Sequence, residues 1–350
     1  MNRIDMASEG ELAVSVLDLV AMHPNETPGA AIGRSVDLAQ HVDAWGYKRF
    51  WLAEHHSIAG IASAATAVLI GHVAGATKTI RVGSGGVMLP NHAPLIIAEQ
   101  FGTLEAMYPG RIDLGLGRAP GGDYQTMRAL RRSMAQNGDD FPELLQELQT
   151  YLGPDPNPAR AGQAVKAIPG QNTNVPITLL GSSGFSAQLA ARLGLPFAFA
   201  AHFAPDYLYA AAEMYHRQFR PSETLAQPYM MVGVQVIAAE TDSEARHLFT
   251  TPQQRFLRLI RGQAVELLPP VDSMDGLWNP AEKAAVESKL GAAIVGSDAT
   301  VKAGLERLVS ATGASEVIVV TDTYRHEDRL ESYRRLAEIS KTVETAAKVA

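Results

Sequence analysis

Short apolar runs alternate with amphipathic segments along most of the chain, and this alternation predicts its fold. The apolar runs are rich in β-branched and aromatic residues, which is typical of strands buried in a parallel sheet. The predicted strands are residues 12–20, 49–53, 80–89, 112–116, 175–180, 196–200, 229–239 and 316–321. The segments between them have the apolar spacing and composition of helices. The predicted helices are residues 31–45, 62–76, 95–107, 184–192, 205–219, 242–260, 282–290, 298–312 and 327–347.

Eight strand-and-helix units in 350 residues predict a (β/α)8 TIM barrel. A regular alternation of strands and helices implies a parallel sheet with right-handed crossovers, and eight such units can close into a barrel. A doubly wound open sheet is the alternative, and the number of strands favours the barrel. No linker-like stretch divides the chain, so we expect a single domain over residues 1–350.

Two stretches interrupt this rhythm, and we expect them to be insertions after the fourth and seventh strands. In residues 123–174, a helical pattern reaches residue 151 with polar breaks at 137–140, and a segment rich in proline, glycine and asparagine follows. Residues 261–295 begin with an irregular segment that contains two prolines in succession. Because long irregular connections usually lie near a functional site, we expect both stretches to shape a pocket.

Composition and charge narrow the classes of function. The net charge of −7 and the isoelectric point near 5.8 argue against nucleic acid or an anionic membrane as the main partner. The chain has no cysteine, which excludes disulfides, thiolate-bound metal clusters and a cysteine nucleophile. Its first residues are polar and no apolar run reaches a membrane-spanning length, so we expect a cytoplasmic protein.

A glycine pair and one arginine follow the fourth predicted strand. Gly115 and Gly117 carry no side chain that would keep a ligand from the backbone, and Arg118 offers a planar fork of donors suited to phosphate. A structural turn whose arginine pairs with a carboxylate is an equally good interpretation of this corner alone. After the fifth strand, residues 181–184 (Gly-Ser-Ser-Gly) open a helix, whose free N–H groups also favour phosphate. Helix capping explains Ser182 and Ser183 by themselves, but together with Arg118 they favour a phosphate site.

Other polar residues also follow predicted strands, where a barrel places its functional groups. Glu54, His55 and His56 follow the second strand, and His202 follows the sixth. Adjacent strand residues point to opposite faces, so the three cannot reach one metal ion without a bend, and we expect no metal. A buried histidine bonded to Glu54 is the structural alternative.

Several well-known signatures are absent from the chain. The dinucleotide fingerprint fails because Pro120 stands in place of its third glycine. There is also no Walker lysine motif, no His-Glu-x-x-His and no Gly-x-Ser-x-Gly.

Four segments together resemble the bacterial luciferase-like flavin monooxygenase family, and the resemblance extends over nearly the whole chain. They are residues 51–56 (Trp-Leu-Ala-Glu-His-His), 80–90 (Ile-Arg-Val-Gly-Ser-Gly-Gly-Val-Met-Leu-Pro), 108–118 (Tyr-Pro-Gly-Arg-Ile-Asp-Leu-Gly-Leu-Gly-Arg) and 181–184. The resemblance implies a (β/α)8 barrel, usually dimeric, that binds FMN or the deazaflavin F420 at the carboxyl ends of its strands.

The resemblance also implies roles for individual residues. His55 matches the family's active-site histidine, and Gly85-Gly86 matches a non-proline cis peptide behind the flavin ring. Arg118, Ser182 and Ser183 match positions that hold the flavin phosphate. We place the remaining glycines of these turns, Gly117, Gly181 and Gly184, in the same cofactor site. Luciferase has an acidic residue at the position of Gly181, which leaves the individual phosphate contacts open.

The implied function is a monooxygenase that uses reduced FMN and O2 to oxidise a small organic substrate of unknown identity. A separate flavin reductase would supply the reduced FMN, and His55 would act as general acid or base with a pKa near neutrality. The alternatives are an F420-dependent hydride-transferring oxidoreductase and a non-catalytic flavin-binding protein, with a metal-dependent hydrolase more remote. Asp18, at the end of the first strand, either orients substrate or histidine or is a turn residue, and we favour the turn. His202 has no family role and is expected to line the pocket.

Overall fold

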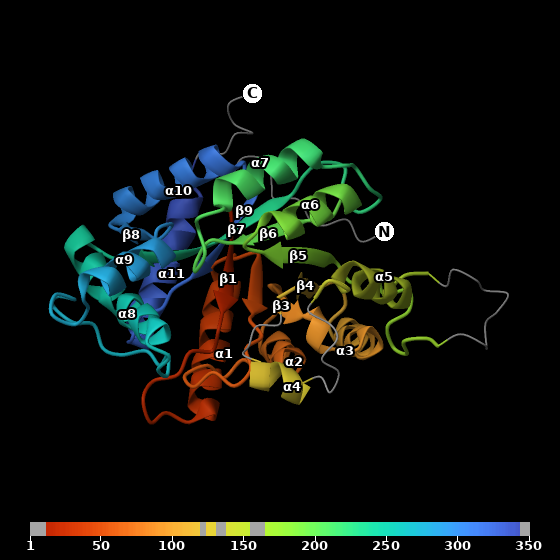
Figure 1. Cartoon of the computed structure of the whole chain (residues 1–350), viewed down its shortest axis with the longest axis horizontal. Coiled ribbons are helices and arrows are strands. Elements are labelled where there is room, and N and C mark those ends of the chain that lie inside the picture. The colour runs from red at the N-terminus through yellow and green to blue at the C-terminus, as the bar shows by residue number, and fades with distance from the viewer. Residues whose placement is uncertain (1–11, 120–123, 131–137, 155–164, 344–350) are drawn as a thin grey trace.

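Eight parallel strands close into a barrel in the computed structural model, which describes residues 12–119, 124–130, 138–154 and 165–343 (Figure 1). Neighbouring strands pair in sequence order from β1 to β7, β7 pairs with β9, and β9 pairs with β1. This closed ring confirms the predicted (β/α)8 barrel, because a doubly wound sheet would leave two strand edges unpaired. The barrel strands are β1 (Ala13–Asp18), β2 (Arg49–Leu52), β3 (Arg81–Met88), β4 (Ile112–Gly117), β5 (Ile177–Gly181), β6 (Phe197–Ala200), β7 (Met230–Ala238) and β9 (Glu316–Val320).

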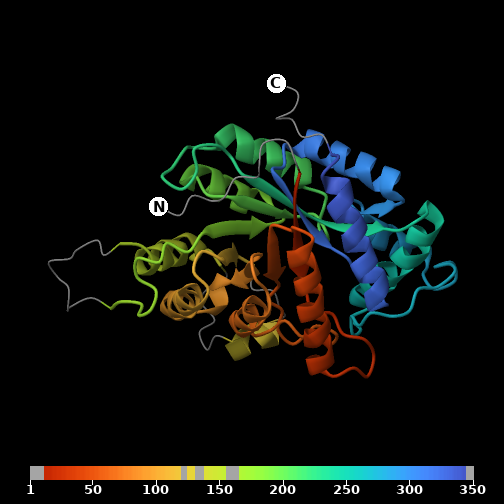
Figure 2. The same ribbon diagram turned by 180° about the vertical axis from the view of Figure 1, so that it is seen from behind.

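Helices surround the barrel (Figure 2), and their ends follow local sequence signals. Thr27 and Thr241 accept backbone N–H groups at the starts of α1 and α8, and Gly194 and Gly313 end α6 and α10 in the left-handed conformation. Helices between or after the barrel strands include α1 (Pro28–Ala44), α2 (Thr66–Ala76), α3 (Pro94–Met107), α6 (Gly184–Leu193), α7 (Leu208–Gln218), α8 (Asp242–Ile260), α10 (Asp298–Thr312) and α11 (His326–Ser340).

The observed elements depart from the predicted ones in three places. The helical pattern at 123–151 corresponds to two helices, α4 (Tyr124–Leu130) and α5 (Phe141–Leu152), with residues 131–137 outside the described part of the chain. A short strand, β8 (Ile294–Gly296), pairs with the outer end of β7 and was not predicted, because three residues show no periodicity. The last helix ends at Ser340 and a turn follows it, with Val343 fully buried; the predicted residues 344–347 lie outside the described part of the chain.

The remaining elements lie in the two irregular stretches and beside β3. Helices α4 and α5 lie between β4 and β5, and the prediction for residues 155–164 falls outside the described residues. Residues 261–279 are irregular, and α9 (Pro280–Lys289) follows them before β8. A single 3-10 turn, η1 (Leu89–Asn91), continues from β3.

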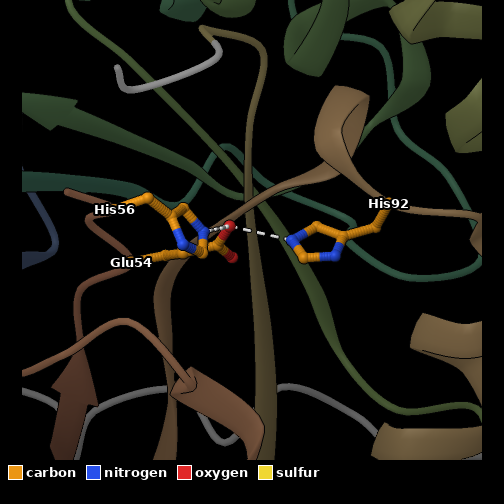
Figure 3. Close-up of side chains that lie close together, drawn as sticks. All are labelled: Glu54, His56 and His92. Atoms are coloured by element: carbon orange, nitrogen blue, oxygen red, sulfur yellow. Dashed lines mark hydrogen bonds and ion pairs between the residues drawn. The ribbon is translucent and has the colours of Figure 1, made fainter. Parts of the chain in front are cut away.

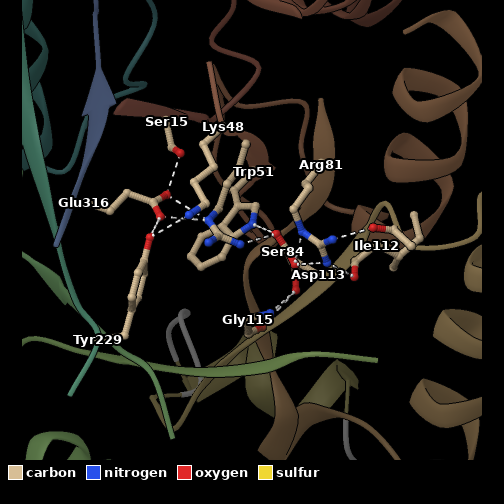
Figure 4. Close-up of polar contacts among 12 residues, drawn as sticks. Ser15, Lys48, Trp51, Arg81, Ser84, Ile112, Asp113, Gly115, Tyr229 and Glu316 are labelled. Atoms are coloured by element: carbon tan, nitrogen blue, oxygen red, sulfur yellow. Dashed lines mark hydrogen bonds and ion pairs between the residues drawn. The ribbon is translucent and has the colours of Figure 1, made fainter. Parts of the chain in front are cut away.

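A buried polar network occupies the interior of the barrel at the amino ends of its strands (Figure 4). Arg49 donates from Nε to Glu316 Oε1 at 2.8 Å and from Nη1 to Asp113 Oδ2 at 2.8 Å. Arg81 adds a second guanidinium to Asp113, and the Tyr229 hydroxyl donates to Glu316 at 2.6 Å. These charges compensate one another, and the buried side chains of Arg49, Asp113 and Glu316 occupy the amino end of the barrel.

No helix among the described residues is long and apolar enough to cross a membrane.

Candidate active site

A cavity of about 540 Å³ lies at the carboxyl ends of the strands, within the size range of ligand pockets. On four strands, residues of its wall recur at every second position, because alternate side chains of a barrel strand point inward. On the second strand this pattern selects His55 and not His56. The inward series are Trp51, Ala53 and His55; Ala198, Ala200 and His202; Gly233 and Gln235; and Ile318, Val320 and Asp322.

His55 faces this cavity as predicted, but its charge state differs from the expectation. Nδ1 is enclosed without a hydrogen-bond partner among the described residues. Burial, together with the smaller effect of the nearby positive charge of Arg255, lowers the pKa of His55 to about 4. The expected pKa near neutrality is therefore wrong for this structure, and His55 is uncharged at pH 7.

Glu54 lines the cavity and is bonded to His56 and His92, which are not part of the lining (Figure 3). Both Nε2 atoms lie 2.8 Å from the same carboxylate oxygen, Oε1, and Met88 donates its N–H to Oε2 at 3.2 Å. Burial opposes ionisation of Glu54, but the hydrogen bonds from His92 and His56 outweigh it and lower its pKa. The histidine bonded to Glu54 is thus His56, with His92, which the sequence analysis did not single out.

This cluster has the ligand types of a metal site, a carboxylate and two imidazoles. Its three candidate ligand atoms also lie within 4.8 Å of one another. Both nitrogens are already at hydrogen-bond distance from the carboxylate, so the arrangement is accounted for without an ion. The cluster connects the end of β2 to the end of β3 and thereby fixes the wall beside His55.

The predicted phosphate residues meet at another side of the same cavity. Gly117, Arg118, Gly181, Ser182 and Ser183 all contribute to its lining. No carboxylate of the described residues pairs with Arg118, whose guanidinium lies 4.3 Å from the centre of the Phe185 ring. The interpretation of this corner as a paired structural turn is therefore not supported.

The N-terminus of α6 adds a second anion-binding feature beside Arg118. Ser183 occupies the N-cap position, but its side chain makes no capping hydrogen bond. Helix capping therefore does not explain this serine, and the first N–H groups of the helix are left for a ligand. A guanidinium and an uncapped helix N-terminus on one cavity wall form a place that could hold a phosphate.

The glycines at the site are required by close packing. Gly85 and Gly86 are joined by a cis peptide bond, as the family resemblance implied. A Cβ on Gly85 would lie 2.7 Å from Leu17 Cδ1, and one on Gly86 would lie 2.7 Å from the Gly115 carbonyl oxygen. The cavity therefore has bare backbone at this position, against which a flat ring system could lie.

The other two predicted glycines differ in their surroundings. A Cβ on Gly181 would lie 2.6 Å from Ser186 Oγ, so Ser186 occupies the space that an acidic side chain would need. Gly184 does not line the cavity. It packs against Tyr207 and Met214 at the start of α6, and only its backbone N–H remains to contribute to a ligand site.

Three polar residues on the far side of the cavity were not found from the sequence: Gln235, Arg255 and Asp322. Asp322 lies two residues after inward-facing Val320, so the strand-end rule used for His55 would have found it. Gln235 interrupts an otherwise apolar strand, and this interruption was also a usable signal. Arg255 gave no signal, because a charged residue within a helix is usually exposed.

Asp18 lies outside the cavity lining. Its Oδ1 accepts hydrogen bonds from the Val20 N–H at 2.9 Å and from Arg329 at 3.0 Å. This supports the interpretation of Asp18 as a strand-end residue. His202 does line the cavity, and burial lowers its pKa to about 4.

Three loop segments cover the apolar part of the cavity. Val265 donates its N–H to Ala59 at 2.9 Å, Leu267 donates to Met22 at 2.9 Å, and Met22 donates to Gly60 at 2.9 Å. Side chains from two of these segments, Ile58, Ile61 and Val265, reach the lining. The segment after α8 therefore helps to shape the pocket, as expected for the second irregular stretch.

A closed parallel barrel with a ligand-sized cavity at the carboxyl ends of its strands has the layout of a barrel enzyme. Within that class, a model described as luciferase-like monooxygenase matches residues 12–316. The chain therefore belongs to the luciferase-like monooxygenase family.

Individual relatives agree with this assignment over their whole length. A luciferase-like monooxygenase of Escherichia coli (strain K12) is 48% identical, over 94% of this chain and 97% of the relative. The N-acetyl-S-alkylcysteine monooxygenase of Bacillus subtilis (strain 168) is 31% identical, over 93% of this chain and 98% of the relative. These two comparisons cover nearly all of the barrel.

Solved structures share the fold as well. The structure of apo-MsnO8 superposes with a TM-score of 0.86 and 37% identity, over 94% of this chain and 98% of that chain. The FMN complex of the oxygenating constituent of 3,6-diketocamphane monooxygenase from Pseudomonas putida has a TM-score of 0.72 at 19% identity, covering 95% and 98%. An F420-dependent secondary alcohol dehydrogenase has a TM-score of 0.67 at 12% identity, covering 94% and 99%. The last two are likenesses of fold alone.

Proposed function

We propose that the protein is a flavin-dependent monooxygenase that uses reduced FMN and O2 to oxidise a small organic substrate. The observation that carries the proposal is the position of Arg118, which has no carboxylate partner among the described residues and shares the cavity with the uncapped start of α6 and with His55. Membership of the luciferase-like monooxygenase family supports the reaction class.

The residues present fit such a cofactor. Arg118 and the N–H groups at the start of α6 would hold the phosphate, and the backbone of Gly85 and Gly86 would support the ring. Reduced flavin, when bound, supplies the electrons for the reaction with oxygen.

His55 has a defined part in this arrangement. It is uncharged at pH 7, so it can accept a proton from a bound molecule before it donates one. Because Nδ1 is enclosed, proton exchange with a ligand falls to Nε2. The retention of this histidine in the cavity argues against a flavin-binding protein without turnover.

An F420-dependent hydride transfer is the second candidate. It is favoured by the likeness of the barrel to an F420-dependent alcohol dehydrogenase, which shows that this fold accommodates the deazaflavin. The phosphate corner, which we define as Arg118 and the first N–H groups of α6, suits either cofactor, and the binding titration described below distinguishes the two.

Two partners complete the proposal. A separate flavin reductase would supply the reduced FMN, and a second copy of the chain would form a homodimer in the cytoplasm. Exposed apolar side chains on neighbouring helices, Val68 on α2 and Ile96 and Met107 on α3, support the homodimer. Light scattering coupled to size exclusion would test it, and a monomeric mass at micromolar concentration would contradict it.

The test of the function is an anaerobic titration of the purified protein with reduced FMN and, in parallel, with F420. We expect reduced FMN to bind in the low-micromolar range and its oxidation after oxygen is added to differ in rate from that of free reduced FMN. Preference for F420 with no oxygen reaction would replace the monooxygenase with the hydride-transfer candidate. Binding of neither cofactor would overturn both.

A further inference from the structure

Arg255, Gln235 and Asp322 form a polar cluster in the cavity wall that the flavin site does not use. Arg255 on α8 donates from Nη1 to Asp322 Oδ2 at 2.6 Å, and Gln235 on β7 donates from Nε2 to the same oxygen at 3.1 Å. All three side chains are buried, with Arg255 only 6% exposed. We call this set the Arg255 cluster.

The cluster has hydrogen-bonding capacity that the protein does not use. A guanidinium has five N–H donors, and Nη1 is the only nitrogen of Arg255 that bonds to a described residue. Gln235 Oε1 is buried and has no hydrogen-bond donor among the described residues. Because buried polar groups are almost always paired, the remaining donors of Arg255, which lines the cavity, are suited to a ligand.

The cluster lies opposite the phosphate corner. Around the ring of eight strands, β4, which precedes Arg118, and β9, which precedes Asp322, are four strands apart, the greatest separation possible. His55 follows β2, which is two strands from each. A molecule held at the Arg255 cluster can therefore extend to His55 without entering the phosphate corner.

The wall beside the cluster is apolar. Phe256 and Leu259 follow Arg255 on α8, and Ile58, Ile61 and Val265 come from the covering loops. A ligand that fits both parts has one polar head and an apolar body. The free Nε and Nη2 edge of Arg255 presents two parallel donors, which matches a carboxylate better than a single carbonyl or hydroxyl oxygen.

We propose that the Arg255 cluster binds the carboxylate of an amphipathic carboxylic acid, whose apolar part lies against the α8 and loop side chains. The statement that this acid is the molecule oxidised rests on the proposed monooxygenase function. The proposal that the acid binds here is independent of that function. Asp322 holds the guanidinium in place, and Gln235 holds Asp322. Asp322 compensates much of the charge of Arg255, so recognition of the carboxylate depends mainly on two directed hydrogen bonds. The expected preference for a carboxylate over an uncharged head group is therefore moderate.

Calorimetric titration with three ligands of one chain length, octanoate, octanamide and 1-octanol, tests the proposal in protein without flavin. We expect octanoate to bind at least about tenfold more tightly than the other two, which corresponds to charge-assisted hydrogen bonds. The variant Arg255→Met should reduce this preference to about twofold or less. The matched variant Arg118→Met should keep the preference, because it removes the other cavity arginine.

A second variant covers the case in which Arg255→Met does not fold, because it leaves Asp322 without its partner. Arg255→Lys keeps the charge but removes the pair of parallel guanidinium donors. The preference for octanoate over the other two ligands should therefore fall by at least about threefold. Equal binding of the three ligands to the wild type would overturn the proposal, and so would a preference that disappears in Arg118→Met and persists in the Arg255 variants. Octanamide binding as tightly as octanoate would overturn the carboxylate assignment.

The two proposals can fail separately. If the wild type binds neither reduced FMN nor F420 but its octanoate preference depends on Arg255, the flavin proposal fails and the carboxylate site stands. If reduced FMN binds and octanoate has no preference, only the carboxylate site is overturned.

Discussion

His55 and His202 follow strands on two sides of the cavity, and burial lowers the pKa of both to about 4. For His202 the folded pKa is thus below the value near 6.5 of an unfolded chain. As the pH falls from about 6.5 toward 4, the unfolded state binds a proton that the folded state does not. The stability contributed by the uncharged imidazole is therefore complete at neutral pH and is lost on acidification.

The variant His202→Asn should make stability less dependent on pH in this window. We expect the loss of unfolding free energy between about pH 7 and about pH 4.5 to be smaller than in the wild type by roughly 1–2 kcal/mol, a value kept modest because His202 lines the cavity. Urea denaturation at the two pH values measures it, with the exposed His41→Asn as control. An unchanged pH dependence would show that His202 titrates normally.

The variant Arg118→Met should distinguish phosphate binding from ring binding. We expect it to weaken reduced FMN binding by about tenfold to a hundredfold and to leave reduced riboflavin, which has no phosphate, unaffected. Anaerobic titration of both flavins measures the difference, with Arg128→Met on α4 as control. Equal weakening of both flavins would mean that Arg118 supports the cavity wall and does not bind phosphate.

At the scale of elements, the covering loops depend on Gly60, which holds the loop after β2 against the segment after α8. Its φ is +99°, and a Cβ there would lie 2.6 Å from the Glu266 backbone nitrogen. Two requirements coincide at this position, a left-handed backbone and a close approach of another chain segment. The backbone hydrogen bond between Val265 and Ala59 depends on both.

The variant Gly60→Ala should therefore loosen the covering segment. We expect a loss of about 2–3 kcal/mol in the free energy of unfolding and faster proteolysis within residues 261–279. Gly262→Ala is the matched control, since its φ is +66° but nothing lies within 4 Å of its Cβ, and about 1 kcal/mol is expected. Equal effects of the two variants would mean that backbone strain alone decides the stability of this loop.

At the scale of the whole molecule, the network around Arg49 ties distant parts of the barrel together, because Asp113 lies on β4 and Glu316 on β9. Burial opposes ionisation of both acids, but Arg49 outweighs it, with help from Arg81 at Asp113 and Lys48 at Glu316, and the pKa of each is lowered. A depressed carboxyl pKa stabilises the fold above the unfolded value, near 4, and the stabilisation is lost as the pH falls below it.

The variant Asp113→Asn should leave Arg49 and Arg81 short of a counter-charge. We expect a loss of about 3 kcal/mol in unfolding free energy at about pH 7, and a smaller difference from the wild type at about pH 3.5. Urea denaturation at both values measures it, with the exposed Glu213→Gln as control. A difference that is constant with pH would mean that Asp113 contributes by packing alone.

The sequence predicted the barrel because each strand carries its own apolar pattern, whereas side-chain clusters depend on the folded arrangement. The strand-end rule found Glu54, His55 and His56, and the family resemblance selected His55 among them; the same rule would have found Asp322. The roles of His92 and Arg255 could not be predicted from the sequence. Neither residue stands at a strand end, and each is bonded to a partner remote in sequence, His92 to Glu54 and Arg255 to Asp322. The depressed pKa of His55 likewise comes from burial and Arg255, which only the folded chain brings together.

The division of the cavity among the strands affects how binding and folding are coupled. The phosphate corner comes from β4 and β5, near the middle of the chain, while the Arg255 cluster needs β7, α8 and the last strand. A chain emerging from the ribosome thus has Arg118 and His55 long before Asp322 is made. A ligand that contacts both the Arg255 cluster and His55 would bridge the pair β9 and β1, so that its binding also stabilises closure of the ring.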